Sequence, residues 1–284
     1  MMQKASLKGY LKKLKERLDI LLVERGYFET RERAKASIMA GVVFVDGNLS
    51  DKAGTKIDTE AMIEVREDTC PYAGRGGLKL EKAIKSFQID LTGKNCIDIG
   101  ASTGGFTDCM LQSGAAKVYS VDVGYGQLAW KLRNDPRVVN MEKTNFRYLD
   151  PETIPEKLDF AGVDVSFISL KHILPVAAKV LNDAASAVCL VKPQFEAGRE
   201  EMKNSKGIVR DPEVRRKAIL DVCGYARENG FYPAGLSWSP IRGAKGNIEF
   251  LLYLTRDPAS ELEDITVAAA DIAAAAHEEL EGNK

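Results

Sequence analysis

The feature that most constrains the fold of this chain is a series of short apolar segments between residues 95 and 255, with helical stretches between most of them. The segments read N-C-I-D-I-G, K-V-Y-S-V-D-V-G, V-V-N-M, L-D-F-A-G-V-D-V, A-V-C-L-V-K and I-E-F-L-L-Y-L. Strands that alternate with helices form a parallel sheet with helices on both faces. The sequence therefore predicts an α/β domain of Rossmann-like architecture over residues 78–257.

A smaller domain is predicted before it, over residues 14–69. The chain has 284 residues, of which 45% are hydrophobic, and this suffices for one large domain and a small companion. One helix ends at Gly26, and a second extends from Thr30, a favourable N-cap, to Gly41. V-V-F-V-D-G-N then indicates a strand with a tight turn, and residues 61–65 indicate another strand. These elements predict a small α+β domain.

Composition changes at both ends of the large domain. Residues 70–77, C-P-Y-A-G-R-G-G, are rich in glycine, which indicates a linker, and the Ala- and Glu-rich residues 258–284 are expected to form a helical acidic tail. Residues 1–35 hold ten Lys/Arg against five Asp/Glu, whereas residues 256–284 hold two against eight. A basic N-terminal region suits a polyanionic partner, although a solvated lysine-rich terminus has the same composition.

Several classes of protein are excluded by what the sequence lacks. The five cysteines are scattered, without the close pairs that are typical of zinc sites and disulfide frameworks. No apolar run approaches the roughly 20 residues that cross a bilayer, and the N-terminal segment has no long apolar run of the kind found in export signals. We therefore expect a cytoplasmic protein that has no metal site and no membrane partner.

The sequence D-I-G-A-S-T-G-G-F-T, residues 98–107, follows the first strand where the chain turns into a helix. Small residues there let the backbone approach a nucleoside cofactor, and Asp122 at the end of the next strand can accept hydrogen bonds from ribose hydroxyls. Ser102 replaces the glycine that would admit a pyrophosphate, which favours S-adenosylmethionine over a nicotinamide cofactor. The expected cofactor residues are Asp98, Gly100, Ser102, Thr103, Gly104, Gly105, Phe106, Asp122 and Asp164.

Four ionisable residues lie where this fold would direct them into one cleft. Lys79 opens the first helix of the large domain, Asp164 and Lys192 end the fourth and fifth strands, and Glu249 begins the last strand. Ligands bind at the carboxyl ends of parallel strands, so Asp164 and Lys192 are expected beside the reactive group of the cofactor. Each residue alone could form an ordinary salt bridge. Together, the four are the predicted catalytic residues.

Motifs in both domains resemble known families. E-R-L-D-I-L-L-V-E-R-G, T-R-E-R-A-K-A-S-I-M-A-G and V-F-V-D-G resemble the RNA-binding domain named after small-subunit ribosomal protein four. The Lys-Asp-Lys-Glu set matches the tetrad of ribose 2′-O-methyltransferases with an FtsJ-like fold.

The whole chain resembles the TlyA family, also called hemolysin A proteins and regarded as ribosomal RNA methyltransferases. The resemblance covers residues 16–255 and is carried by R-G-G-L-K-L-E-K-A, D-I-G-A-S-T-G-G-F-T-D, D-V-S-F-I-S-L, L-V-K-P-Q-F-E, G-I-V-R-D-P and G-N-I-E-F-L. Gly74 departs from the family pattern, in which a serine precedes Arg75.

The resemblance implies methylation of a ribose 2′-hydroxyl by S-adenosylmethionine, with ribosomal RNA or ribosomal subunits as partners and cytidine as the family expectation. Lys192 is then expected to remove the hydroxyl proton or to stabilise the developing oxyanion, while Lys79 and Glu249 orient the hydroxyl and the nucleotide. The sequence leaves open which subunit and nucleotide are modified, and the oligomeric state.

The resemblance also implies that the second N-terminal helix presents basic residues to RNA phosphates. Residues 193–210 lack clear periodicity and are interpreted as a substrate lid or a plain surface loop, in which Arg199, Lys203 and Lys206 could meet phosphates. The expected RNA-binding residues are Arg17, Arg31, Arg33, Lys35, Phe195 and Arg242.

Three alternative functions are weighed against methyl transfer. A noncatalytic RNA-binding factor for ribosome assembly would not require both the cofactor loop and the tetrad. A hemolysin, which the family name suggests, would need a membrane-active segment, and the sequence has no strongly amphipathic basic helix. A nicotinamide-dependent dehydrogenase is disfavoured by the loop pattern.

Overall fold

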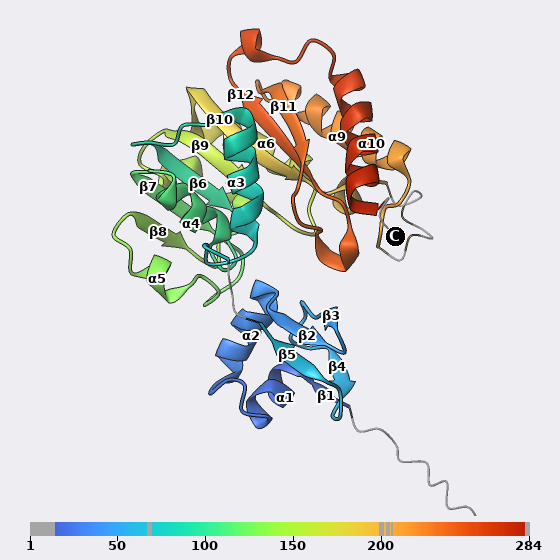
Figure 1. Ribbon diagram of the computed structural model, residues 1–284. Helices are drawn as coiled ribbons and strands as arrows, with labels where there is room; N and C mark the ends of the chain where they lie inside the picture. The colour runs from blue at the N-terminus through green and yellow to red at the C-terminus, as the bar shows by residue number, and fades with distance from the viewer. Residues whose placement is uncertain (1–14, 67–69, 199–201, 203–204, 206, 282–284) are drawn as a thin grey trace, which may run out of the picture. The chain divides into compact units, whose positions relative to one another are not determined.

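The computed structural model describes residues 15–66, 70–198, 202, 205 and 207–281, and the chain divides into two compact units, residues 1–70 and residues 71–284 (Figure 1). Arg199, Lys203 and Lys206, which the sequence assigns to a lid, lie outside the described residues. Among the described residues, none of the helices combines the length and the apolar character that crossing a bilayer requires.

The first unit is the small α+β domain that the sequence predicts. Its elements are β1 (Lys15–Arg17), α1 (Leu18–Glu24), α2 (Arg31–Ala40), β2 (Val43–Val45), β3 (Asn48–Leu49), β4 (Lys56–Asp58) and β5 (Ile63–Val65). Thr30 caps α2 by accepting a hydrogen bond from the Arg33 N–H at 3.2 Å, and Gly41 ends the helix in the left-handed conformation. Strand β2 pairs antiparallel with β3 and β5, and β1 pairs with β4.

The second unit is built on a seven-stranded sheet with the order β11-β12-β10-β9-β6-β7-β8. Strands β6 to β10 are parallel, whereas β12 runs antiparallel to both β10 and β11. The strands are β6 (Asn95–Ile99), β7 (Lys117–Val121), β8 (Val138–Met141), β9 (Leu158–Val163), β10 (Leu181–Val191), β11 (Tyr232–Trp238) and β12 (Phe250–Thr255). Its described α-helices include α3 (Gly76–Phe87), α4 (Gly105–Gln112), α5 (Trp130–Arg133), α6 (Leu174–Val180), α7 (Pro193–Glu196), α9 (Pro212–Glu228) and α10 (Ile265–Glu281).

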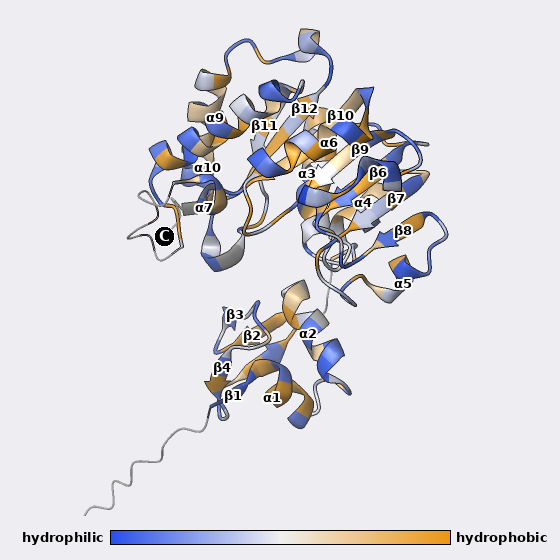
Figure 2. Cartoon of the chain, turned by 180° about the vertical axis from the view of Figure 1, so that it is seen from behind, coloured by the Kyte–Doolittle hydropathy of each residue, from blue (hydrophilic) through white to orange (hydrophobic). Residues whose placement is uncertain are grey.

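Two hydrophobic clusters cover the two faces of this sheet. Apolar residues of α3 and α4 pack with Cys96 of β6 in one cluster, and those of α6, α9 and α10 pack with Ile97 and Ile99 in the other. Successive strand side chains point to opposite faces, so one buried strand serves both clusters. Figure 2 shows hydrophobic and hydrophilic stretches alternating along the outer helices, as expected for helices with one face on a sheet. The predicted α/β fold is confirmed.

The structure differs from the sequence-based prediction at three places. Strand β11 was not expected, because Y-P-A-G-L-S-W lacks a continuous apolar run, and the antiparallel direction of β12 does not follow from helix–strand alternation. Residues 71–77 belong to the second unit, and α3 already begins at Gly76. The helix expected within residues 258–284 is present as α10, but it packs on the core and buries Ala269, Ala273 and Ala276 there.

Candidate active site

The predicted cofactor loop joins β6 to α4 at the carboxyl end of the sheet. Gly100, Ser102 and Gly104 all have positive φ angles, and Thr103 is half-buried. The segment 71–77 packs against this loop, because a Cβ at Gly74 would lie only 2.3 Å from Thr103 Oγ1. The glycine at position 74 permits this close approach. Phe106, which the sequence predicts to bind the cofactor, is buried in the hydrophobic cluster beneath the loop.

Asp122, immediately after β7, fixes the shape of the loop. Its Oδ2 accepts a hydrogen bond from the Ser102 N–H at 2.8 Å, and its Oδ1 accepts one from the Gly124 N–H at 2.6 Å. A carboxylate offers about four lone-pair sites, so acceptor capacity remains for hydroxyl groups. Val123, the next residue, is 69% exposed and provides an apolar surface beside this carboxylate. Sequence reasoning missed Val123, although its position after the acidic residue could have identified it.

Asp98 is a fully buried carboxyl group near the loop. Its Oδ2 accepts hydrogen bonds from the N–H and the hydroxyl of Thr107 at 2.8 and 2.7 Å, whereas Oδ1 is buried and has no hydrogen-bond partner. Burial raises the pKa of Asp98 to about 7, against the opposing effect of the Thr107 hydrogen bonds. An unsatisfied buried acceptor of this kind needs an explanation, and a cationic ligand group would provide it.

The four predicted catalytic residues converge from four different elements. Lys79 Nζ lies 2.7 Å from Glu249 Oε2 and 3.5 Å from Asp164 Oδ2, and Lys192 Nζ lies 2.5 Å from Asp164 Oδ1. Glu249 directly precedes β12. It can join the group because β12 is antiparallel, so that β12 begins at the edge of the sheet where β9 and β10 end. The side chains are at most 18% exposed. The site is therefore a nearly buried network of two cations and two anions.

The charges in this network stabilise one another. Burial by itself would lower the pKa of Lys79, but attraction to Asp164 and Glu249 outweighs it and raises that pKa. Burial would likewise raise the pKa of Asp164, but the two lysines lower it to about 2. Lys79 is consequently a fixed ammonium group and Asp164 a fixed carboxylate at neutral pH.

A loop between β11 and β12 supports Glu249. The Ser239 N–H donates a hydrogen bond to the Glu249 carbonyl oxygen at 2.8 Å. A Cβ at Gly243 would lie 1.8 Å from Glu249 Oε1, so only glycine lets this loop pass over the carboxylate. Arg242, predicted to bind RNA, is half-buried in the same loop.

An aromatic pair adjoins the tetrad. Phe167, three residues after Asp164, has a φ of 64° and is 89% exposed. Its ring centroid lies 5.0 Å from that of Phe195, which follows Lys192 by three residues. A bulky residue held at positive φ with its ring in solvent is strained and needs a functional explanation. Phe195 was predicted from the sequence but Phe167 was not, although D-V-S-F places Phe167 three residues after Asp164.

The predicted RNA-binding residues of the first unit lie at or near α2. Arg17 and Arg31 both bond to the buried carboxylate of Asp19, at 2.9 and 2.8 Å. Arg33 forms an exposed pair with Glu29, and Lys35 is half-buried on the helix. The structure thus gathers two of the four residues at one carboxylate.

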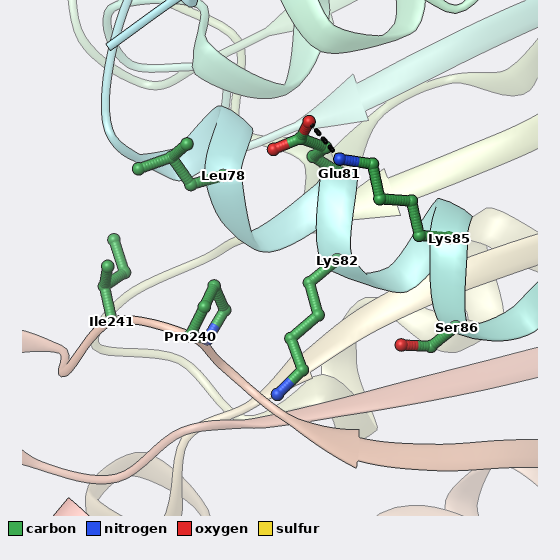
Figure 3. Close-up of a pocket in the computed structure, with 7 residues that line it drawn as sticks. All are labelled: Leu78, Glu81, Lys82, Lys85, Ser86, Pro240 and Ile241. Atoms are coloured by element: carbon green, nitrogen blue, oxygen red, sulfur yellow. Dashed lines mark hydrogen bonds and ion pairs between the residues drawn. The ribbon is translucent and has the colours of Figure 1, made fainter. Parts of the chain in front are cut away.

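A pocket of about 280 Å³ lies between α3 and the segment that follows β11 (Figure 3). The Lys82 ammonium group lies 4.1 Å from the centroid of the Trp238 ring, and Lys85 pairs with Glu81 at 2.6 Å. None of the tetrad residues lines this pocket, which is formed by Leu78, Glu81, Lys82, Lys85, Ser86, Pro240 and Ile241.

Comparison with known proteins agrees with the two units. The FtsJ-like methyltransferase family matches residues 72–256, and the S4 domain family matches residues 16–63. YqxC of Bacillus subtilis, named as a candidate rRNA methyltransferase, is 55% identical over 84% of this chain and 85% of its own length. The 16S/23S rRNA (cytidine-2′-O)-methyltransferase TlyA of Mycobacterium tuberculosis is 44% identical over 84% of this chain and 89% of its own length.

A solved structure extends the similarity to the full fold. A candidate hemolysin from Streptococcus thermophilus is 48% identical, covers 95% of this chain and 98% of its own, and has a TM-score of 0.75. The Brachyspira hyodysenteriae protein named Hemolysin A is 44% identical over 84% of this chain and 98% of its own length. This chain, with its S4 domain and its FtsJ-like methyltransferase domain, therefore belongs to the TlyA family.

Proposed function

We propose that this protein uses S-adenosylmethionine to methylate a ribose 2′-hydroxyl of cytidine in ribosomal RNA, in the cytoplasm where ribosomal subunits are found. The observation that carries the proposal is the nearly buried tetrad of Lys79, Asp164, Lys192 and Glu249 beside a nucleoside-binding loop. The M. tuberculosis relative is named for both subunits and a Campylobacter jejuni relative for 23S rRNA alone, so the proposal covers both RNAs.

The residues of the loop fit S-adenosylmethionine. We assign the ribose hydroxyls to Asp122, the adenine face to the exposed Val123, and the ammonium group of the methionine part to the unpartnered oxygen of Asp98. When bound, this cofactor supplies a methyl group on a sulfonium centre.

Lys192 is proposed to act on the attacking oxygen. Its ammonium group already bonds to Asp164 Oδ1 at 2.5 Å and to Ser166 Oγ at 3.1 Å. An ammonium group has three donors, so one is left for the ribose 2′-oxygen. The hydroxyl proton passes to solvent water, and a cation at Lys192 stabilises the negative charge that develops on this oxygen, which promotes its attack on the methyl group.

The other residues hold the substrate in line with the methyl group. Lys79 remains charged between Asp164 and Glu249, and these ion pairs hold the three side chains in place. The ribose is positioned against the surface that they form. Phe167 and Phe195 provide an aromatic surface on which the target base can stack once it leaves its helix.

Methyl transfer with two lysine variants tests this proposal. Purified protein is incubated with radiolabelled S-adenosylmethionine and isolated ribosomal subunits or deproteinised ribosomal RNA. Lys192→Met should lower the transfer rate at least 100-fold, the order expected for the loss of a transition-state donor, while S-adenosylhomocysteine still binds. Lys157→Met is the matched control, because Lys157 is exposed and precedes β9 at the opposite edge of the sheet. Bound cofactor without transfer to any of these RNAs would favour a noncatalytic assembly factor.

A further inference from the structure

Asp19 in the first unit is a buried carboxylate that joins two arginines from different elements. It lies in the first turn of α1 and has no exposed side-chain surface. Arg17 donates to it through Nε at 2.9 Å and Nη2 at 3.1 Å, and Arg31 of α2 donates through Nη2 at 2.8 Å. Hydrogen bonding from Arg17, together with Arg31, lowers the pKa of Asp19 to about 2, despite the opposing effect of burial. The carboxylate is thus ionised at every pH at which RNA is bound.

The two guanidinium groups remain accessible although their shared anion does not. The Arg17 side chain is 40% exposed and the Arg31 side chain 47% exposed, whereas that of Asp19 is 0% exposed. Each guanidinium has five N–H donors in a fixed plane, of which Asp19 engages two from Arg17 and one from Arg31. The arrangement therefore presents two oriented planar cations to solvent, which is the geometry that phosphate oxygens bind best.

We propose that Asp19 is a positioning residue that orders Arg17 and Arg31 for the phosphates of structured ribosomal RNA. This proposal rests on the function proposed above. Two effects of the carboxylate oppose each other: its negative charge repels phosphates, but it removes in advance the rotamer freedom that two long side chains would lose on binding. Electrostatic repulsion alone predicts tighter RNA binding when Asp19 is neutralised, whereas preorganisation predicts weaker binding.

Asp19→Asn in the full-length protein separates these two effects. Filter binding to deproteinised 16S and 23S ribosomal RNA should show roughly tenfold weaker affinity and a smaller dependence of log K on log salt, because fewer phosphate contacts form. Glu64→Gln is the matched control, since it removes the same charge from an exposed pair with Arg66 in the same unit. The control should bind as tightly as the wild type or more tightly. Unchanged or tighter binding by Asp19→Asn would overturn the proposal.

A double-mutant comparison distinguishes positioning from a purely structural role. In an Arg17→Ala/Arg31→Ala background, Asp19→Asn should weaken RNA binding no further, because the groups through which it acts are absent. An additional loss there would mean that Asp19 acts through the general stability of the unit, against the proposal. If Asp19→Asn does not fold, Arg17→Lys/Arg31→Lys keeps both charges without the planar donors and should also bind more weakly. Wild-type affinity in that variant would refute the proposal.

The same preparation tests the underlying function separately. Wild-type protein that transfers methyl groups to ribosomal RNA while Asp19→Asn keeps full affinity would contradict only the role of Asp19. Wild-type protein that neither binds nor methylates ribosomal RNA would contradict both proposals.

Discussion

Replacing Glu249 by glutamine tests whether the tetrad is an electrostatic unit. Glutamine keeps the shape of the side chain, which has to fit beneath Gly243. It removes the negative charge that lies 2.7 Å from Lys79 Nζ. Lys79 stays protonated and buried, with only Asp164 left as an anion shared between two lysines. A buried charge that loses its partner destabilises a protein by about 3–5 kcal/mol. For a domain of this size, the melting temperature should fall by roughly 6–20 °C.

The double variant Lys79→Met/Glu249→Gln makes the prediction specific. It removes the cation together with the anion, so Asp164 and Lys192 remain as a neutral pair, and most of the lost stability should return. Differential scanning calorimetry measures the melting temperatures of Glu249→Gln, Lys79→Met and the double variant. Glu81→Gln is the control on α3, the helix that holds Lys79. It breaks an exposed pair with Lys85 and should lower the free energy of unfolding by about 1 kcal/mol or less. If the double variant loses as much stability as the two single variants together, the four residues are not coupled and the reasoning fails.

Three further predictions concern Asp98, the binding of the cofactor product and the stacking of the target base. Burial raises the pKa of Asp98 to about 7, above the value near 3.9 in the unfolded chain. The free energy of unfolding should therefore fall as pH rises from about 4 to 7 and then level off. Chemical denaturation of Asp98→Asn should not show this decline. S-adenosylhomocysteine should bind more tightly as pH rises from 6 to 8, because its ammonium group favours the ionised carboxyl group of Asp98. Titration calorimetry on Asp98→Asn should show an affinity that does not change over this pH range. Phe167→Gly should raise the melting temperature, because glycine relieves the strain of the positive φ. The same variant should raise KM for RNA roughly tenfold, because it removes a stacking surface. An unchanged KM would exclude base stacking on Phe167.

Features set by local sequence were predicted successfully. Thr30 and Gly41 cap α2 as expected, because a hydroxyl before the first turn and a glycine after the last satisfy backbone groups locally. Short motifs predicted the places of Lys79 near the start of a helix and of Asp164, Lys192 and Glu249 at the ends of strands. Asp164 and Lys192 meet because the sheet gathers the carboxyl ends of its parallel strands, which the fold class predicts. Glu249 joins them because β12 is antiparallel, which the fold class does not predict.

Features set by long-range packing were not predicted. Strand β11 exists because β12 supplies its hydrogen-bond partners, and no pattern within Y-P-A-G-L-S-W requires it. The C-terminal segment was predicted as a helical acidic tail, and the sequence did not indicate that the alanine face of this helix packs on α9 and β11. Similarly, the exposure and strained backbone of Phe167 depend on how the chain leaves β9, which composition does not reveal.

The most direct test of the account is the position of the transferred methyl group. Ribosomal subunits are incubated with the protein and S-adenosylmethionine that carries a deuterated methyl group, and the RNA is then digested to nucleosides for mass spectrometry. We expect one labelled species, 2′-O-methylcytidine, from the wild-type protein and its absence with Lys192→Met. A deuterated methyl group on a base, or the same ribose label with Lys192→Met, would contradict the proposed site.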